Sequence, residues 1–227
     1  KNEEAKAIEF MEREIVLASE RHTGRSTFPR EMEGQPVGAY LLITLDSDSE
    51  DQLYTLLEQA AELVLDAGAM DVLVADSPAK MRDAWAARSA FLEVIMEETK
   101  LLDECDVVVP VTKIASYLEF VNKTGEECGL VIRSFGHAGD GNLHIYECSN
   151  DLTEEEFKKR VDKFFDLIYK EASAQGGLVS GEHGIGSGKI QYLVESIGET
   201  NMALMEGIKR VFDPKMILNP GKVCYRL

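Results

Sequence analysis

Two histidines lie seven residues apart in the segment "RSFGHAGDGNLHIYE" (133–147), although the whole chain contains only four histidines. His137 precedes, and His144 follows, a short run of Gly, Ala, Asp and Asn, which favours a tight turn between two strands. In such a hairpin both imidazoles can project from the same rim of the sheet, which suits two ligands of one metal ion. A histidine pair at this spacing is also common as a purely structural feature.

A second segment, "GGLVSGEHGIGSGK" (176–189), adds a carboxylate and a third imidazole, Glu182 and His183. Six glycines fall within residues 176–188, a composition that favours close backbone approach over core packing. Two histidines and one carboxylate can hold Zn²⁺ with a coordination position left open, and Fe²⁺ or Mn²⁺ can use the same donors. The sequence therefore predicts a metal site of His137, His144 and Glu182, with Zn²⁺ as the expected ion.

His183, next to this carboxylate, would remain free for proton transfer, a common role of histidine side chains in active sites. The alternative for this segment is a phosphate-binding loop that runs into the helix near Lys189. The glycine and lysine spacing of residues 184–189 does not match that of a P-loop, which argues against this alternative.

The apolar spacing predicts the elements that must position these residues. We expect strands over 37–47, 70–76, 106–110, 130–137 and 143–147. We expect helices over 5–20, 49–68, 77–100, 112–128, 151–177, 188–197 and 200–212. This order predicts an α+β sandwich in which helices cover one face of a largely antiparallel sheet.

Charge and composition narrow the class of protein. Lys and Arg number 24 against 41 Asp and Glu, a net charge of −17, which argues against a nucleic-acid partner. No apolar run approaches the roughly 18 residues of a membrane span, and the four cysteines lack CxxC spacing, so we expect reduced thiols in a cytoplasmic protein. Because the chain opens at Lys1 within a helical pattern, we also expect a fragment of a longer protein.

Three motifs together carry a family resemblance: "GHAGDGNLH", "SGEHGIGSGK" and the terminal "DPKMILNPGKV". With "AIEFMERE" near the start, "WAAR" at 85–88 and "DVVVP" at 106–110, they resemble the C-terminal domain of FAD-linked oxidases over nearly the whole chain. That family includes glycolate oxidase, D-lactate dehydrogenase and D-2-hydroxyglutarate dehydrogenase. The resemblance implies that residues 1–227 form a ferredoxin-like substrate cap over FAD, which a separate N-terminal domain holds.

The resemblance also implies roles for single residues. His137, His144 and Glu182 would hold the divalent metal and His183 would be the catalytic base. Arg88 would pair with the substrate carboxylate and Asn219 would lie near the flavin. For Arg88 the alternative is a surface ion pair on its helix, and we expect Trp85 to lie in the core.

The resemblance has departures that bear on the substrate. Members that oxidise dicarboxylates carry Thr, Lys and Asn where this chain has Leu92, Glu104 and Tyr146, which favours a small D-2-hydroxy acid such as D-lactate or glycolate. We also expect an electron-transfer partner, and a peripheral membrane association through the N-terminal half that this chain lacks. The fragment alone should be inactive. Two other functions stay open: a non-catalytic ferredoxin-like metabolite-binding module, and a zinc-dependent hydrolase.

Overall fold

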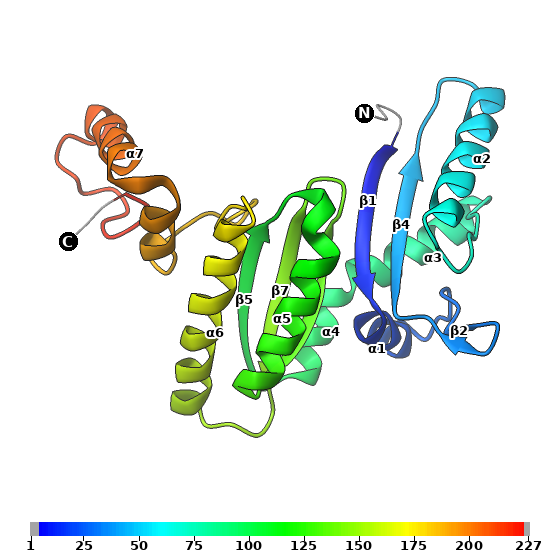
Figure 1. Ribbon diagram of the computed structural model, residues 1–227, viewed down its shortest axis with the longest axis horizontal. Coiled ribbons are helices and arrows are strands. Elements are labelled where there is room, and N and C mark those ends of the chain that lie inside the picture. Colours follow the sequence, from blue (N-terminus) through cyan, green and yellow to red (C-terminus); the bar gives the residue numbers. More distant parts are fainter. Residues whose placement is uncertain (1–4, 225–227) are drawn as a thin grey trace. The chain divides into compact units, whose positions relative to one another are not determined.

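The computed structural model describes residues 5–224 and combines antiparallel strands with covering helices (Figure 1). The α+β class expected from the sequence is confirmed. The chain divides into two units. Unit 1 comprises the described residues up to Leu102 together with Arg133–Gly139 and Cys148–Leu152. Unit 2 comprises Asp103–Ile132, Asp140–Glu147 and the described residues from Thr153 onward.

Unit 1 is built around strand β1 (Ala5–Glu12), which pairs antiparallel with β4 (Ala39–Leu45) and with β6 (Val131–His137). The register with β6 places Glu9 opposite His137. Helix α1 (Arg13–Thr23) follows β1 and packs against α3 (Pro78–Ser89) and α4 (Phe91–Glu98). The other elements of the unit are α2 (Glu50–Asp66) and the short strands β2 (Glu31–Met32) and β3 (Gln35–Pro36).

The helix expected over residues 5–20 is wrong in its first half, because residues 5–12 form a strand. Ile8 and Phe10 suit a strand, and β1 has hydrogen-bonded neighbours on both sides. Pairing on both edges outweighs the intrinsic helical preference of Ala, Lys and Glu in this segment. As a result Glu9 and Met11 lie on the same face of the strand and are both buried.

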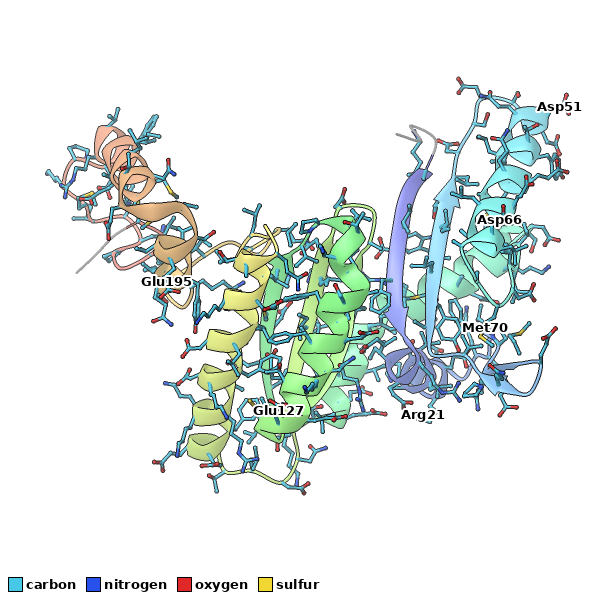
Figure 2. All side chains as sticks on the ribbon, viewed as in Figure 1. Arg21, Asp51, Asp66, Met70, Glu127 and Glu195 are labelled. Atoms are coloured by element: carbon cyan, nitrogen blue, oxygen red, sulfur yellow. The ribbon has the colours of Figure 1, made fainter. Side chains whose placement is uncertain are left out.

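The strand expected over residues 70–76 is absent from the described structure. No neighbouring strand pairs with this segment among the described residues, and its apolar side chains Met70, Leu73 and Val74 stay exposed (Met70 is labelled in Figure 2). The helix expected over 77–100 is divided at Ala90 into α3 and α4. Trp85 of α3, which we expected in the core, is exposed.

Unit 2 contains most of the neighbouring strands β5 (Leu101–Val108) and β7 (Asn142–Ser149). A short 3₁₀ turn (Val111–Lys113) leads into α5 (Ile114–Cys128), which packs side by side with α6 (Glu154–Ala174). Thr153 caps α6 as predicted, because its hydroxyl accepts a hydrogen bond from the Glu156 backbone N–H. The last helix, α7 (Ile190–Phe212), contains a break at Gly198, where the sequence predicted two helices.

Side-chain alternation gives β5 and β7 two chemically different faces. One face carries Cys105, Val107, Leu143, Ile145 and Glu147, all of them buried. The other face carries the polar side chains Glu104, Asp106, His144 and Tyr146. Among the described residues, no helix is both long and apolar enough to cross a membrane.

Candidate functional site

Two of the three predicted metal ligands meet within unit 2. His144 of β7 lies with its Nε2 atom 3.1 Å from Oε1 of Glu182, in the glycine-rich segment that follows α6. His183, the next residue, stacks its ring on that of His144, with centroids 4.9 Å apart and an interplanar angle of 25°. The predicted base thus lies directly beside the predicted ligands His144 and Glu182.

Asp106 of β5 holds the segment that carries Glu182 and His183. Its Oδ2 atom accepts hydrogen bonds from the Ser180 hydroxyl (2.7 Å) and from the backbone N–H groups of Gly181 (3.0 Å), Glu182 (3.0 Å) and His183 (2.8 Å). Burial alone would raise the pKa of Asp106, but these hydrogen bonds stabilise its charged form and lower the pKa overall. One buried carboxylate therefore fixes the backbone on which both functional side chains stand.

Two glycines allow this arrangement. A Cβ atom at Gly181 would overlap the side chain of Asn142, so only glycine lets the loop pass this close to β7. Gly141 adopts a φ of 76°, and its carbonyl accepts a hydrogen bond from the Val109 backbone N–H at 3.0 Å. The glycines in the motifs thus permit close backbone approach, as their number predicted.

Glu104 of β5 joins the same cluster, which the sequence pattern did not predict. Its Oε1 atom lies 3.0 Å from Nδ1 of His183 and 3.7 Å from Nδ1 of His144, and it accepts a hydrogen bond from the Tyr146 hydroxyl at 3.0 Å. Although partial burial would raise the pKa of Glu104, the nearby imidazoles of His144 and His183 and the Tyr146 hydroxyl lower it overall.

Two other predicted residues, Arg88 and His137, contact Glu9 within unit 1. Oε2 of Glu9 accepts a hydrogen bond from Nε of Arg88 (3.0 Å) and lies 2.8 Å from its Nη2 atom, while Oε1 lies 2.8 Å from Nδ1 of His137. The guanidinium also lies over the Phe135 ring, 4.6 Å from its centroid. Arg88 therefore forms an ion pair. The alternative considered above was an ion pair at the surface, whereas this one is largely buried, with side-chain exposures of 13% for Arg88 and 5% for Glu9.

His144 and Glu182 lie close enough together to act as two ligands of one metal ion, although the same separation also fits a hydrogen bond between them. Two ligands with bonds of about 2.0–2.1 Å at a tetrahedral ion lie roughly 3.3 Å apart, and the Nε2–Oε1 separation here is 3.1 Å. Imidazole nitrogen and carboxylate oxygen are also the donors that Zn²⁺, Fe²⁺ and Mn²⁺ accept. His137, the third predicted ligand, lies in unit 1, with Glu9 at its Nδ1 atom, and its place in the metal site stays a prediction.

Asn219, the predicted flavin contact, is exposed and has a positive φ of 47°. Its side-chain oxygen accepts a hydrogen bond from Lys222 Nζ at 3.3 Å. The loop before it is held by Asp213, which accepts hydrogen bonds from the backbone N–H groups of Ile217 and Leu218. An exposed amide on a held loop is compatible with a contact to another domain, and the role of Asn219 stays a prediction.

The sequence pattern did not reveal Glu9, Asp106 or the contacts of Glu104. The expected helix over 5–20 hid the period-two pattern that places Glu9 beside Met11 on the buried face of β1. For Asp106, a usable signal existed: an acidic residue at the start of the otherwise apolar run "DVVVP" requires hydrogen-bond partners when that run is buried. The contacts of Glu104 arise from segments 42 and 79 positions away, which spacing alone does not reveal.

Comparison with known proteins places the chain in a family. Residues 1–223 match the family described as "FAD linked oxidases, C-terminal domain". The chain belongs to this family. The resemblance inferred from the three motifs is therefore confirmed.

Relatives within the family are similar over nearly the whole of this chain. A D-lactate dehydrogenase of Anaerostipes hadrus is 58% identical over 221 residues, which are 97% of this chain and 46% of that protein. A D-lactate dehydrogenase of Archaeoglobus fulgidus is 37% identical, with the same two coverages of 97% and 46%. The glycolate oxidase protein GlcD of Bacillus subtilis is 29% identical over 95% of this chain and 44% of its own length. The chain thus spans less than half the length of these relatives.

The fold is shared with a more distant solved structure. p-Cresol methylhydroxylase with substrate bound superposes with a TM-score of 0.63 at 15% sequence identity, over 96% of this chain and 46% of that chain. At this identity the likeness supports the fold alone.

Proposed function

We propose that the chain is the substrate- and metal-binding domain of a flavin-dependent dehydrogenase that oxidises a small D-2-hydroxy acid to the 2-oxo acid. The observation that carries this proposal is the cluster in unit 2, where His183, the proposed base, stacks on His144, which in turn contacts Glu182. FAD would be held mainly by an N-terminal domain of the kind that the family's description as a C-terminal domain implies. Residues 1–227 would form one functional domain beside it.

His144, Glu182 and His137 are proposed to hold one divalent ion, with Zn²⁺ expected and Fe²⁺ or Mn²⁺ as alternatives. Such an ion supplies Lewis-acid chemistry, which lowers the pKa of a hydroxyl group bound to it. FAD supplies the acceptor for the hydride that leaves the α-carbon. Asn219 is proposed to lie near that flavin.

The chain's own residues would bind the substrate and move one proton. Arg88 would orient the substrate carboxylate, because Glu9 engages its Nε and Nη2 atoms and, among the described residues, Nη1 has no hydrogen-bond partner. His183 would accept the hydroxyl proton at a ring nitrogen. Loss of that proton and of a hydride converts the 2-hydroxy acid into the 2-oxo acid.

A small monocarboxylate such as D-lactate or glycolate suits this cluster better than a dicarboxylate. The carboxylate of Glu104 lies 3.0 Å from the proposed base and is 30% exposed. A second carboxylate on the substrate would meet this negative charge in a chain that already carries a net charge of −17. The two D-lactate dehydrogenases among the relatives support the same choice.

The test is an oxidation assay with D-lactate and an artificial electron acceptor, in a flavoprotein that combines this chain with its flavin-binding domain. We expect His183→Gln to lower kcat by about 10²–10⁴-fold, the usual contribution of a general base. Arg88→Lys should raise KM, because lysine does not reproduce the paired donors of a guanidinium. His22→Gln, at the exposed end of α1, is the matched control and should leave both constants unchanged.

The assay also separates the alternatives. A non-catalytic metabolite-binding module would show no D-lactate oxidation and would tolerate Glu182→Ala. A zinc hydrolase would be active without flavin. A cytoplasmic location, a peripheral membrane association and an electron-transfer partner stay predictions that fractionation of cells and copurification would address.

A further inference from the structure

Glu104 contacts Nδ1 of the His183 imidazole, whereas the neighbouring residue Glu182 lies nearer Nε2. Oε1 of Glu104 lies 3.0 Å from Nδ1 of His183, whereas Nε2 of the same ring lies 4.0 Å from the Glu182 carboxylate. The ring of His144 stacks on that of His183. Only one ring nitrogen of His183 is therefore in hydrogen-bond contact with Glu104.

A carboxylate only accepts hydrogen bonds, so the nitrogen that faces Glu104 must carry the proton. For a neutral imidazole this leaves Nε2 without a proton and able to act as a base. Since His183 is 39% exposed, packing alone does not fix its ring, and a hydrogen bond is needed to select one tautomer and one orientation.

Tyr146 in turn holds Glu104. Its hydroxyl donates to Oε1 of Glu104 at 3.0 Å, and Tyr146 itself is 4% exposed. A buried phenol on β7 thus restricts the rotamers of a half-buried carboxylate on the neighbouring strand. The three side chains form a chain of contacts in the order Tyr146, Glu104 and His183.

We propose that Glu104, held by Tyr146, is a positioning residue that keeps His183 protonated at Nδ1 and leaves Nε2 as the proton acceptor. This inference rests on the proposed function for the role of His183. It adds Glu104 and Tyr146 to the residues that the proposed reaction uses. Neither residue touches the substrate in this proposal. Both act through the imidazole.

The first test measures the tautomer directly, by ¹⁵N NMR of the histidine-labelled chain, with His183→Gln to assign the signal. We expect a protonated Nδ1 in the native chain and a shift toward protonated Nε2 in Glu104→Gln, because an amide can donate to Nδ1. Tyr146→Phe should give a smaller shift in the same direction. Asp103→Asn, at an exposed position of the same strand, is the control and should give none.

The second test is kinetic and uses the flavoprotein with D-lactate. We expect Glu104→Gln to lower kcat at least about tenfold, the usual effect of removing a hydrogen-bond partner that orients an active-site histidine, with KM little changed. In a His183→Gln background the same substitution should cause no further loss, because both changes act through one group. Bound metal should be the same in the native and Glu104→Gln proteins.

Three results would overturn the proposal: an unchanged His183 tautomer in Glu104→Gln, a loss of kcat that adds fully to that of His183→Gln, or loss of the metal with Glu104. The last result would make Glu104 a ligand. Full activity of His183→Gln would instead refute the role of His183 as the base. The NMR result would still decide whether Glu104 sets the tautomer of His183.

Discussion

At the scale of single residues, Glu9 shares one carboxylate between Arg88 and His137, with one oxygen for each. Both members of the Glu9–Arg88 pair are largely removed from solvent, so each compensates the buried charge of the other. The carboxylate also fixes which nitrogen of His137 faces away from it, because Nδ1 is engaged. Glu9 thereby prepares both residues for their proposed roles.

Replacement of Glu9 by Gln should therefore destabilise the fold strongly. An unpaired guanidinium would remain in a largely buried site, a defect that typically costs about 3–5 kcal/mol. The free energy of unfolding, measured by urea denaturation, should fall by about this amount. Glu14→Gln, at a carboxylate whose side chain is 62% exposed, should change it by less than about 0.5 kcal/mol. Equal effects of the two substitutions would contradict the buried ion pair.

Glu147 of β7 presents the opposite case, a buried carboxyl group that lacks a partner. It is 0% exposed, and neither carboxyl oxygen has a hydrogen-bond partner among the described residues. Burial first, and then the negative charges of Asp103 and Glu104, raise its pKa well above the ordinary value. Because the folded state keeps this proton where the unfolded chain releases it, stability falls as the pH rises above the unfolded pKa of about 4.3.

The corresponding prediction is a pH-dependent stability that Glu147→Gln removes. Between the unfolded and folded pKa values, one retained proton lowers the free energy of unfolding by up to about 1.4 kcal/mol per pH unit. Urea denaturation from about pH 4.5 to 8, a range that begins near the unfolded pKa, should show a shallower slope in Glu147→Gln than in the native chain, and higher stability at neutral pH. Glu119→Gln, on the exposed side of α5, should leave the slope unchanged. Parallel curves for all three proteins would show that Glu147 is charged in the fold.

At the scale of elements, the loop that carries Glu182 and His183 is held to β5 by one oxygen of Asp106. We predict that Asp106→Asn weakens Zn²⁺ binding by about tenfold, because loss of the charge loosens the three backbone hydrogen bonds that position the ligand. Isothermal titration with Zn²⁺ would measure this. Asp103→Asn on the same strand is exposed and should bind as the native chain does. Unchanged affinity in Asp106→Asn would mean that other contacts hold the loop.

Most elements could be predicted from the sequence, because the spacing of apolar residues and the capping signals are local. Thr153 before "EEEF" and Ser49 before "EDQ" both cap helices in the structure, as their types indicated. The two segments predicted as the wrong type of element, residues 5–12 and 70–76, concern strands. Whether a segment pairs as a strand depends on an available partner elsewhere in the chain, and no local pattern supplies that information.

At the scale of the whole molecule, the motifs identified which residue types could do chemistry but not the contacts that orient them. His144, Glu182 and His183 were predicted from two glycine-rich segments, and unit 2 brings these three together. The Glu9–Arg88 pair joins residues 79 positions apart, on a strand that the local pattern suggested was helical. Long-range ion pairs of this kind follow from the topology, which only the folded structure supplies.

The central claim, that this chain provides the metal site of a 2-hydroxy-acid dehydrogenase, is tested most directly by elemental analysis of the purified chain. We predict one tightly bound divalent ion per native chain, and its loss in His144→Ala, Glu182→Ala and His137→Ala. His22→Ala, which removes an exposed histidine paired with Glu97, should keep the ion. A native chain that binds no divalent ion after dialysis against zinc, or a Glu182→Ala chain with undiminished metal, would contradict the account.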